Sequence, residues 1–449
     1  MKSGCFRDFV KYSSLNVMGM IGLSCYILAD TYFVSKGLGA NGLTALNLAI
    51  PIYSFIHGSG LMIGMGGGTK YAIQKSQKAY DAANRTFTHA VLLAAVFAAF
   101  FVLAGIFLSG AITSLFGADE TVYEMSKTYL QVILLFAPAF LMNNVLLCFV
   151  RNDGAPQLSM AAMISGSLSN VILDWVFIFP CRMGIFGAVF ATGLAPILSM
   201  LILSSHFIRK KNQFRIIKCR PQGRVVAGIL SSGVPSLVTE VSSGVVIIVF
   251  NAIILRLAGN VGVAAYGVIA NLSLVVIAIF TGIAQGIQPI ISSSYGMKNF
   301  NNIHAILRYA MTTMLLLSAV IYACVFFGAS QIAGIFNSEQ NALLQSMAAE
   351  GLRLYFIACP FAGFNVVISM YFTSTERPRP AHIISLLRGF LVIIPMAFLL
   401  SWIGKIHGVW CAFPATELLV AAIGLLLYFI TKKVQRRTDA DQNTRKQEP

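Results

Sequence analysis

Long apolar stretches recur along the whole chain and are separated by short polar connections. Each stretch holds eighteen or more mostly apolar residues, which is enough to cross a hydrocarbon core of about 30 Å as a helix. The first stretch lacks a small-residue cleavage site and exceeds a signal-peptide core, so we expect it to remain as structure. The predicted spans are 13–36, 43–68, 87–110, 126–149, 157–180, 184–208, 226–256, 261–291, 308–330, 350–374, 381–402 and 406–431.

Composition supports a chain that is embedded in the bilayer. Of its 449 residues, 57% are hydrophobic and only 11% are charged, whereas a soluble domain of this length needs far more charge to cover its surface. The eight cysteines form no CxxC pair and mostly lie within or beside apolar spans, so they indicate neither a disulfide framework nor a metal site. The predicted fold class is an all-α integral membrane protein with twelve transmembrane helices.

The positive charges fix the expected orientation. With twelve spans, 26 of the 32 Lys and Arg residues fall on the side that holds both termini, and six fall on the other side. Such a bias marks the first side as cytoplasmic, so both termini are expected there in a multi-pass protein of the plasma membrane. The net charge of +16 is therefore a topology signal. We expect contact with lipid headgroups and no binding of nucleic acid, because the charges lie at span ends.

The second half of the chain repeats landmarks of the first half. An offset of 220 residues aligns Lys36 with Arg256, Gly39 with Gly259, Gly66 with Gly286 and Lys78 with Lys298. Each repeat has six spans, an even number, so both enter the membrane from the same side and are related by an axis along the membrane normal. An old duplication retained only for structure would give the same pattern, whereas transporters of this design bind substrate between the halves.

The repeat divides the chain into two pseudo-symmetric six-helix lobes. We predict a first lobe over 1–208, a basic cytoplasmic linker over 209–224, a second lobe over 225–433 and a disordered cytoplasmic tail over 434–449. We expect the chain to act as a monomer.

Acidic side chains within the spans are the strongest functional candidates, because each costs at least about 2.5 kcal/mol in the bilayer. Asp30 follows Tyr26 by four residues in span 1, and Asp174 follows Asn170 by four residues in span 5, so each acid has a polar neighbour on the same helical face. Each acid also lies six residues, about 9 Å, from the outer end of its span. We expect the two acids to meet at one depth.

Two carboxylates that share a poorly solvated site cannot both ionise cheaply. Such a pair can hold a proton, or it can hold a monovalent cation together with the oxygens of Asn170, Tyr26 and a hydroxyl. Either outcome provides the chemistry of a coupling site. The alternative is that Asp30 and Asp174 are structural acids, hydrogen-bonded within the bundle or hydrated near the outer interface.

The remaining deep polar residues are less specific. Glu240 in span 7 is either a second ion or cationic-substrate contact, or a structural acid. Glu417 in span 12 is predicted to be structural, and Arg388 could pair with an acid. His57 in span 2 is more typical of a packing residue than of a proton carrier. Residues 58–68 contain a GxxxG pattern, which permits close helix approach.

No nucleotide-binding or hydrolase motif is present in the chain. The glycine-rich stretches lack GxxxxGK[ST], and HExxH and GxSxG are absent, so we expect no enzymatic activity and no cofactor. The energy for transport would then come from an ion gradient, with H+ or Na+ as the coupling ion.

At these residues the sequence resembles the MATE (multidrug and toxic compound extrusion) transporters over essentially the whole chain. The resemblance rests on the two six-helix lobes and on Tyr26, Asp30, Asn170 and Asp174, together with the span 6 stretch 187–196. It implies that Asp30 and Asp174 carry the coupling ion, either H+ or a Na+ bound there, and that Tyr26, Asn170 and Thr192 support it.

The resemblance also implies roles in the second lobe. Glu240 matches a glutamate in span 7 that some members use. One branch has an acid in the tenth helix, where this chain has none and Asn365 is the nearest polar candidate, which weakens a second ion site.

The expected function is ion-coupled antiport, in which amphipathic and often cationic organic compounds are exported by alternating access. A lipid-linked saccharide flippase of related fold is one alternative, and it would need Arg or Lys deep in the spans to hold pyrophosphate. A membrane receptor or scaffold that transports nothing is another alternative, and it would have no use for the acid pair.

Overall fold

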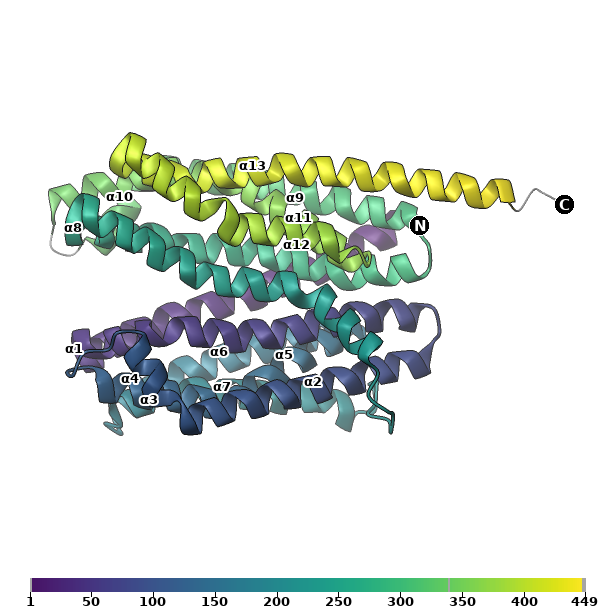
Figure 1. Ribbon diagram of the computed structural model, residues 1–449, viewed down its shortest axis with the longest axis horizontal. Helices are drawn as coiled ribbons and strands as arrows, with labels where there is room; N and C mark the ends of the chain where they lie inside the picture. Colours follow the sequence, from purple (N-terminus) through teal and green to yellow (C-terminus); the bar gives the residue numbers. More distant parts are fainter. Residues whose placement is uncertain (1, 338–339, 446–449) are drawn as a thin grey trace.

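The computed structural model describes residues 2–337 and 340–445, and this part of the chain is helical with no β-strand. Most connections between helices are short (Figure 1). The helices are α1 (Lys2–Ser76), α2 (Tyr80–Phe107), α3 (Ser109–Leu115), α4 (Tyr123–Leu135), α5 (Ala137–Asn152), α6 (Pro156–Ile178), α7 (Gly184–Ile208), α8 (Gly223–Gly296), α9 (Phe300–Phe336), α10 (Ala342–Tyr355), the 3-10 helix η1 (Phe356–Ala358), α11 (Cys359–Ser374), α12 (Pro378–Leu386), the π-helix η2 (Leu387–Leu391) and α13 (Ile393–Arg445).

Twelve membrane spans follow from these helices once their internal breaks are counted. Within the described residues, eight helical stretches are long and apolar enough to cross a bilayer, and α4 and α5, bent by 46°, together make a ninth. Three of the nine contain a residue with non-helical backbone angles, at Gly39, Gly259 and Lys405, and each break divides one stretch into two spans. The predicted fold class is therefore confirmed.

The backbone repeats itself where the sequence does. Gly39 has φ of 67° and ψ of −159°, and its repeat partner Gly259 has φ of 62° and ψ of −158°. Lys78 and Lys298, which close the turns after α1 and α8, also share a positive φ, of 60° and 57°. Only glycine adopts the first pair of angles readily. The 220-residue offset thus aligns equivalent turns in the two halves.

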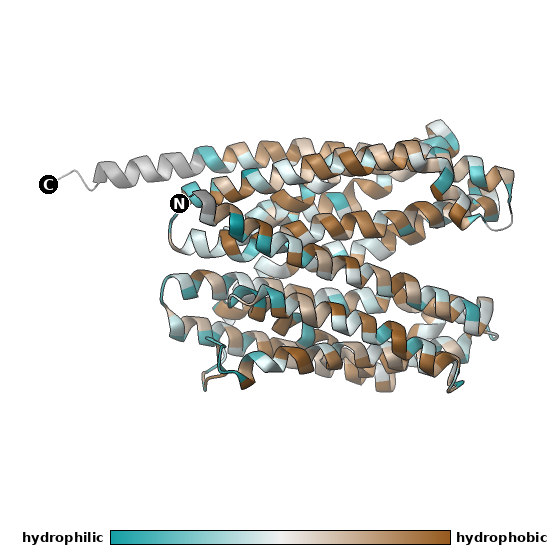
Figure 2. Cartoon of the chain, turned by 180° about the vertical axis from the view of Figure 1, so that it is seen from behind, coloured by the Kyte–Doolittle hydropathy of each residue, from teal (hydrophilic) through white to brown (hydrophobic). Residues whose placement is uncertain are grey.

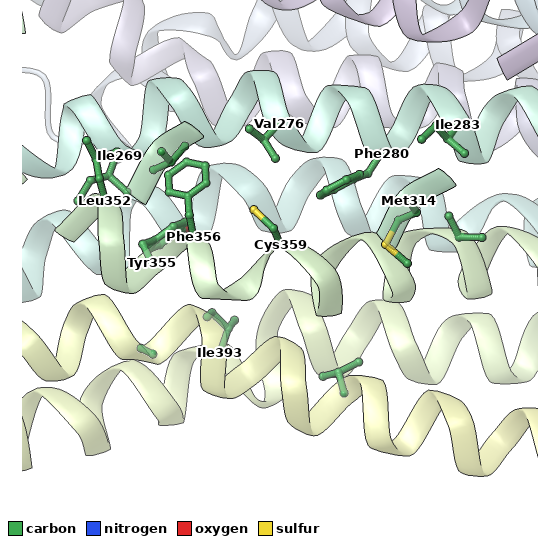
Figure 3. Packing of buried hydrophobic residues seen from close by; sticks show 14 of the residues in the cluster. Ile269, Val276, Phe280, Ile283, Met314, Leu352, Tyr355, Phe356, Cys359 and Ile393 are labelled. Atoms are coloured by element: carbon green, nitrogen blue, oxygen red, sulfur yellow. The ribbon is translucent and has the colours of Figure 1, made fainter. Parts of the chain in front are cut away.

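The chain forms two helical bundles that lie side by side (Figure 1). Helices α1 to α7 make the first lobe and α8 to α13 the second, and each has its own hydrophobic core. In the second core, Val276 and Phe280 of α8 face Phe356 and Cys359 of the α10–α11 segment (Figure 3). Two separate cores leave the interface between the lobes as the place where a cavity can form.

The outer surface of the bundles is apolar, as expected for a surface that faces lipid. Hydrophobic residues cover the helix bodies, and hydrophilic ones gather toward the ends (Figure 2). Phe107, Phe327 and Trp402 are 74%, 79% and 83% exposed, a state that water would disfavour and hydrocarbon tolerates.

The connection between the lobes is anchored by a buried acid. Asp153, after α5, accepts hydrogen bonds from the Tyr71 hydroxyl at 2.6 Å and from the Gln213 backbone N–H at 2.9 Å. Its carboxylate also contacts Lys75 Nζ at 2.6 Å and His206 Nε2 at 2.8 Å. This cluster holds the segment 209–222, which lies between α7 and α8 and lacks helix, against the first lobe. We call the end of the molecule with this segment and the starts of α1 and α8 the linker end, and the opposite end the far end.

The terminal segment is only partly described. Helix α13 continues to Arg445 and so includes residues 434–445 of the segment expected to be a disordered tail, whereas 446–449 lie outside the described residues. The disorder of the tail stays a prediction.

The two lobes are in backbone contact at the linker end. A Cβ added at Gly66 would lie 2.0 Å from the Ile229 carbonyl oxygen, and one at Gly233 would lie 1.8 Å from the Met62 carbonyl oxygen. On the other side of the interface, a Cβ at Gly286 would lie 2.6 Å from Ser13 Cα. Only glycine permits this approach, so the glycines close the linker end of the interface.

Candidate functional site

The two aspartates of the first lobe meet within its helix bundle. Asp30 lies in the first arm of α1, before the break at Gly39, and Asp174 lies on α6, with 7% and 0% of their surfaces exposed. Their carboxyl groups are in side-chain hydrogen-bond contact with one another. The equal depths expected from their spacing to the span ends agree with this contact.

Polar groups from two further helices complete what we call the acid cluster, which comprises Asp30, Asp174, Asn170, Thr192 and Tyr129. With Asn170 Nδ2 turned toward Asp174, it donates to Oδ2 at 3.0 Å, and its Oδ1 accepts from the Thr192 backbone N–H at 3.3 Å. The Thr192 hydroxyl, on α7, donates to the Ala188 carbonyl at 3.1 Å. Tyr129 of α4 is buried near Thr192 and the two carboxyl groups.

The acid cluster has a deficit of positive charge. Among the described residues, no Lys, Arg or His makes an ion pair with Asp30 or Asp174. Asp30 Oδ1 and Asp174 Oδ1 are buried, and neither has a hydrogen-bond partner in that part of the chain. Two buried carboxyl groups in contact, each with an unpartnered oxygen, are suited to hold a proton or a monovalent cation.

Tyr26 lies beside the acid cluster and links it to the rest of the lobe. Its hydroxyl is 2.7 Å from that of Tyr53, in the second arm of α1. The Tyr53 ring stacks on His57, with centroids 5.8 Å apart and planes at 13°. His57 Nδ1 lies 3.5 Å from Glu240 Oε2 on α8, in the second lobe. A continuous chain of polar side chains therefore runs from the first lobe to the second.

A cavity lies along this chain, mainly within the first lobe, and reaches the second lobe at Glu240 and Gln285. Its wall includes Tyr26, Tyr53, His57, Glu240 and Thr192, whereas Asp30 and Asp174 do not line it. The remainder of the wall is largely apolar and includes Met20, Leu23, Leu61, Phe140 and Met163. The Glu240 side chain is 33% exposed. An apolar cavity with a few convergent polar groups is the usual form of a small-molecule site.

The buried acid Glu417 of the second lobe is neutralised within the protein. The buried Glu417 pairs with Arg388 Nε at 2.5 Å, and Asn365 Nδ2 donates to the other carboxylate oxygen at 2.7 Å. The sequence predicts that Arg388 could pair with an acid, and Glu417 is that acid. Asn365, the candidate for a second ion site, is committed to this pair and lies apart from Glu240, which faces the cavity.

Three residues that the structure places at the site were not identified as functional candidates from the sequence. Tyr53 and Tyr129 carry no signal, because a tyrosine in an apolar span usually indicates packing. Arg151 ends α5 and was counted with the cytoplasmic charges, yet it is 2% exposed and lines the cavity. The position of a residue at a span end does not tell which way a long side chain points.

Comparisons with known proteins converge on one family. The MatE family model matches residues 17–176 and 235–399. The chain is 26% identical over 436 residues to the multidrug export protein MepA of Staphylococcus saprophyticus and 23% identical to MepA of Staphylococcus aureus, with 96% of each chain covered. Among solved structures, an outward-facing conformation of a multidrug resistance MATE family transporter has a TM-score of 0.89 and 24% identity, covering 96% of both chains. A MATE structure in complex with MaL6 has a TM-score of 0.90 and 22% identity, covering 96% of this chain and 97% of that one.

Proposed function

Because this chain belongs to the MatE family of multidrug efflux transporters, we propose that it is an antiporter in which protons or sodium ions entering the cell drive the export of amphipathic, often cationic, organic molecules. One observation carries the proposal. Asp30 and Asp174 are buried in contact with each other, and no cation among the described residues compensates them.

A pair of this kind has to take up a positive charge from outside the protein. At low dielectric, two ionised carboxylates in contact repel strongly, so at least one binds a proton or both share a cation. Thr192 and Tyr26 supply nearby hydroxyl oxygens for a bare Na+ in place of water, and rotation of the Asn170 amide would turn its Oδ1 toward Asp174 as a third oxygen ligand. Both H+ and Na+ suit this set of ligands.

The polar chain from Tyr26 to Glu240 offers a route by which the occupancy of the acid cluster affects the lobes. Tyr53 contacts the Tyr26 hydroxyl at 2.7 Å and stacks on His57, and the His57–Glu240 contact crosses the lobe interface. An ion can shift the equilibrium between two conformations only through its differential affinity for them. We propose that alternation of the two states, by movement of the lobes about their interface, gives this difference.

The cavity suits flat, apolar molecules with a positive charge. Methionine and aromatic side chains adapt to varied apolar shapes, and the partly exposed carboxylate of Glu240 can pair with a cation. Competition between substrate and coupling ion for the same negative region would link export to ion entry.

We place the linker end in the cytoplasm of a cell membrane protein, with both termini on that side. The glycine contacts at that end then correspond to a state closed to the cytoplasm. The lipid-facing surface has no evident second use, so we keep the monomer as the expected functional unit.

The proposal is tested by Asp30→Asn and Asp174→Asn in sealed vesicles. Asparagine keeps the shape and removes the titrating group, so we expect each variant to lose ion-driven efflux while remaining folded. Asp119→Asn is the matched control, because Asp119 is exposed between α3 and α4, where hydrogen bonds from the Thr121 hydroxyl and the Val122 N–H lower the pKa of its carboxyl. Full efflux in both cluster variants would refute the coupling role, and separate H+ and Na+ gradients identify the ion.

The same efflux assay also tests the two alternative functions. A receptor or scaffold would show no gradient-driven flux. A lipid-linked saccharide flippase needs deep cations to hold pyrophosphate. Arg388 is paired with Glu417, so among these two deep arginines only Arg151, which is buried in the cavity wall, could serve as such a ligand.

A further inference from the structure

A buried arginine lies at the linker end of the cavity and pairs with no acid in the described ranges 2–337 and 340–445. Arg151 is at the end of α5, is 2% exposed and forms part of the cavity wall. The proposed antiport mechanism makes no use of it.

The neighbours of Arg151 are neutral. Its Nη1 donates to Asn16 Oδ1 at 2.7 Å and to Gln285 Oε1 at 2.9 Å. Its Nη2 is near two sulfur atoms, Met65 Sδ at 3.2 Å and Cys148 Sγ at 3.6 Å, which are weak acceptors. Its Nε is buried without a hydrogen-bond partner in the part of the chain that the structure describes.

A guanidinium in such surroundings is undercompensated. Arginine stays charged in proteins, and a buried charge is normally paired with an opposite one or removed from the interior. Arg388, which is partly buried, follows this rule through its ion pair with Glu417. Among the described residues, Arg151 makes no ion pair.

We propose that Arg151 is an anion-recognition group of the cavity, and that this transporter accepts organic molecules that bear a carboxylate or phosphate. The guanidinium fork matches the oxygens of both groups and can bind them in a bidentate manner. This inference rests on the proposed transport function and adds a substrate class to the cationic compounds expected from Glu240.

The cavity then offers opposite charges to one ligand. Glu240 lines it on the second lobe and Arg151 on the first, and apolar residues such as Met20, Leu147 and Met163 lie in the same wall. A zwitterion with an apolar body can pair with both charges at once, whereas a simple cation can use only Glu240. A charged pair of this kind adds recognition that apolar packing alone lacks.

Arg151 also touches both lobes at the point where they close. Asn16 belongs to α1 and Gln285 to α8, so one nitrogen of Arg151 bridges them. If Arg151 only held the two lobes together through these two contacts, its removal would affect the binding of all substrates alike. Anion recognition instead predicts an effect on the anionic substrates alone, and this difference decides between the two roles.

A pair of rhodamine dyes provides the probe, one with a free carboxylate and one with that carboxylate blocked as a methyl ester. Binding to the purified full-length protein is measured by fluorescence anisotropy without an ion gradient. We expect Arg151→Gln to weaken binding of the free-carboxylate dye by about tenfold to a hundredfold, the loss of a charge-assisted hydrogen-bonded pair. Binding of the ester is expected to change less than about threefold, and Arg151→Lys is expected to retain part of the binding of the free acid.

Controls separate the inference from folding and from the transport function. Arg308→Gln removes an exposed positive charge near the linker end and is expected to leave the binding of both dyes unchanged. If Arg151→Gln lost affinity for both dyes equally while its unfolding midpoint was preserved, Arg151 would have only the structural role and the proposal would be overturned. Unchanged binding of the free-carboxylate dye would also overturn it. Failure of the antiport proposal appears separately, as absent gradient-driven efflux of either dye.

A competition arm distinguishes two sources of the anion. A short-chain isoprenyl pyrophosphate that displaces the free-acid dye from the parent protein, and not from Arg151→Gln, points to a lipid-linked phosphate. Displacement by hydrophobic amino carboxylic acids alone points to a small zwitterion. Displacement by neither class would overturn the anion site.

Discussion

The two lobes bury their acids in different ways. In the first lobe, Asp30 and Asp174 contact each other, and no Lys, Arg or His of the described residues pairs with either. In the second, Glu417 is paired with Arg388 and receives a hydrogen bond from Asn365. The proposed coupling role assigns the binding of an ion to the first cluster, because the charge of the second is already balanced within the protein.

The backbones of the lobes, in contrast, are alike. Gly39 and Gly259 have nearly equal dihedral angles, and Gly66 and Gly286 both lie in tight contacts between the lobes. At the repeat position of Asp30 the second lobe has Phe250, which stacks on Tyr266 at 5.5 Å between centroids. The two lobes thus share a backbone frame but differ in chemistry, which is what the proposed mechanism requires if only the first lobe binds the driving ion.

Breaking the ion pair of the second lobe should have the largest effect on stability. We expect Arg388→Met to lower the free energy of unfolding by about 3 kcal/mol or more, because it leaves Glu417 buried without its counter-charge. Thermal unfolding of the detergent-purified protein measures the change.

The double variant Arg388→Met with Glu417→Gln sharpens the comparison. Removing both charges should recover most of the lost stability, since neither charge is then left uncompensated. Ion-driven efflux should persist in the double variant. A double variant that is stable yet uncoupled would show that the second lobe also takes part in coupling.

The glycine contacts at the linker end should give the next largest effect. Gly66→Ala and Gly286→Ala each force a methyl group into a backbone contact and should destabilise the closed state by about 1–3 kcal/mol. Spin labels at Gln77→Cys and Met297→Cys should then report a greater distance between the lobes at this end. Gly267→Ala is the matched control, because a Cβ there meets nothing within 4 Å. An unchanged distance in both variants would mean that the contacts do not set the equilibrium.

Most of the fold could be predicted from the sequence, because the lipid bilayer that surrounds the chain dictates it. Apolar stretches of bilayer length fixed the number of spans, and the 220-residue offset aligned the turns at Gly39 and Gly259. The breaks at Gly39, Gly259 and Lys405 fall in the gaps predicted between spans, whereas the bend between α4 and α5 and the π-helix at Leu387–Leu391 were not predicted. Such local distortions depend on packing partners that are far apart in sequence.

Only part of the candidate site could be predicted from the sequence, for a related reason. Regular i, i+4 spacing and equal depth suggested the contact of Asp30 with Asp174, because helix geometry is nearly rigid. The pairing of Arg388 with Glu417 and the burial of Arg151 depend on rotamers of long side chains, which sequence position does not determine. The role of the acid cluster in coupling stays a prediction.

The smallest expected effect is at the hydroxyl that joins the acid cluster to the polar chain. Tyr26→Phe removes the 2.7 Å contact with Tyr53 and should cost about 0.5–1.5 kcal/mol, the net value of one hydrogen bond. Because that contact connects the cluster to the lobe interface, we expect ion-driven efflux to fall a few-fold while ion-independent substrate binding is retained. Tyr266→Phe is the matched control in the second lobe, since its ring can keep stacking between Phe250 and Trp410. Equal losses of efflux in the two variants would indicate that either change destabilises the helix packing in general. The proposal that the first lobe responds to the ion and the second does not would then be refuted.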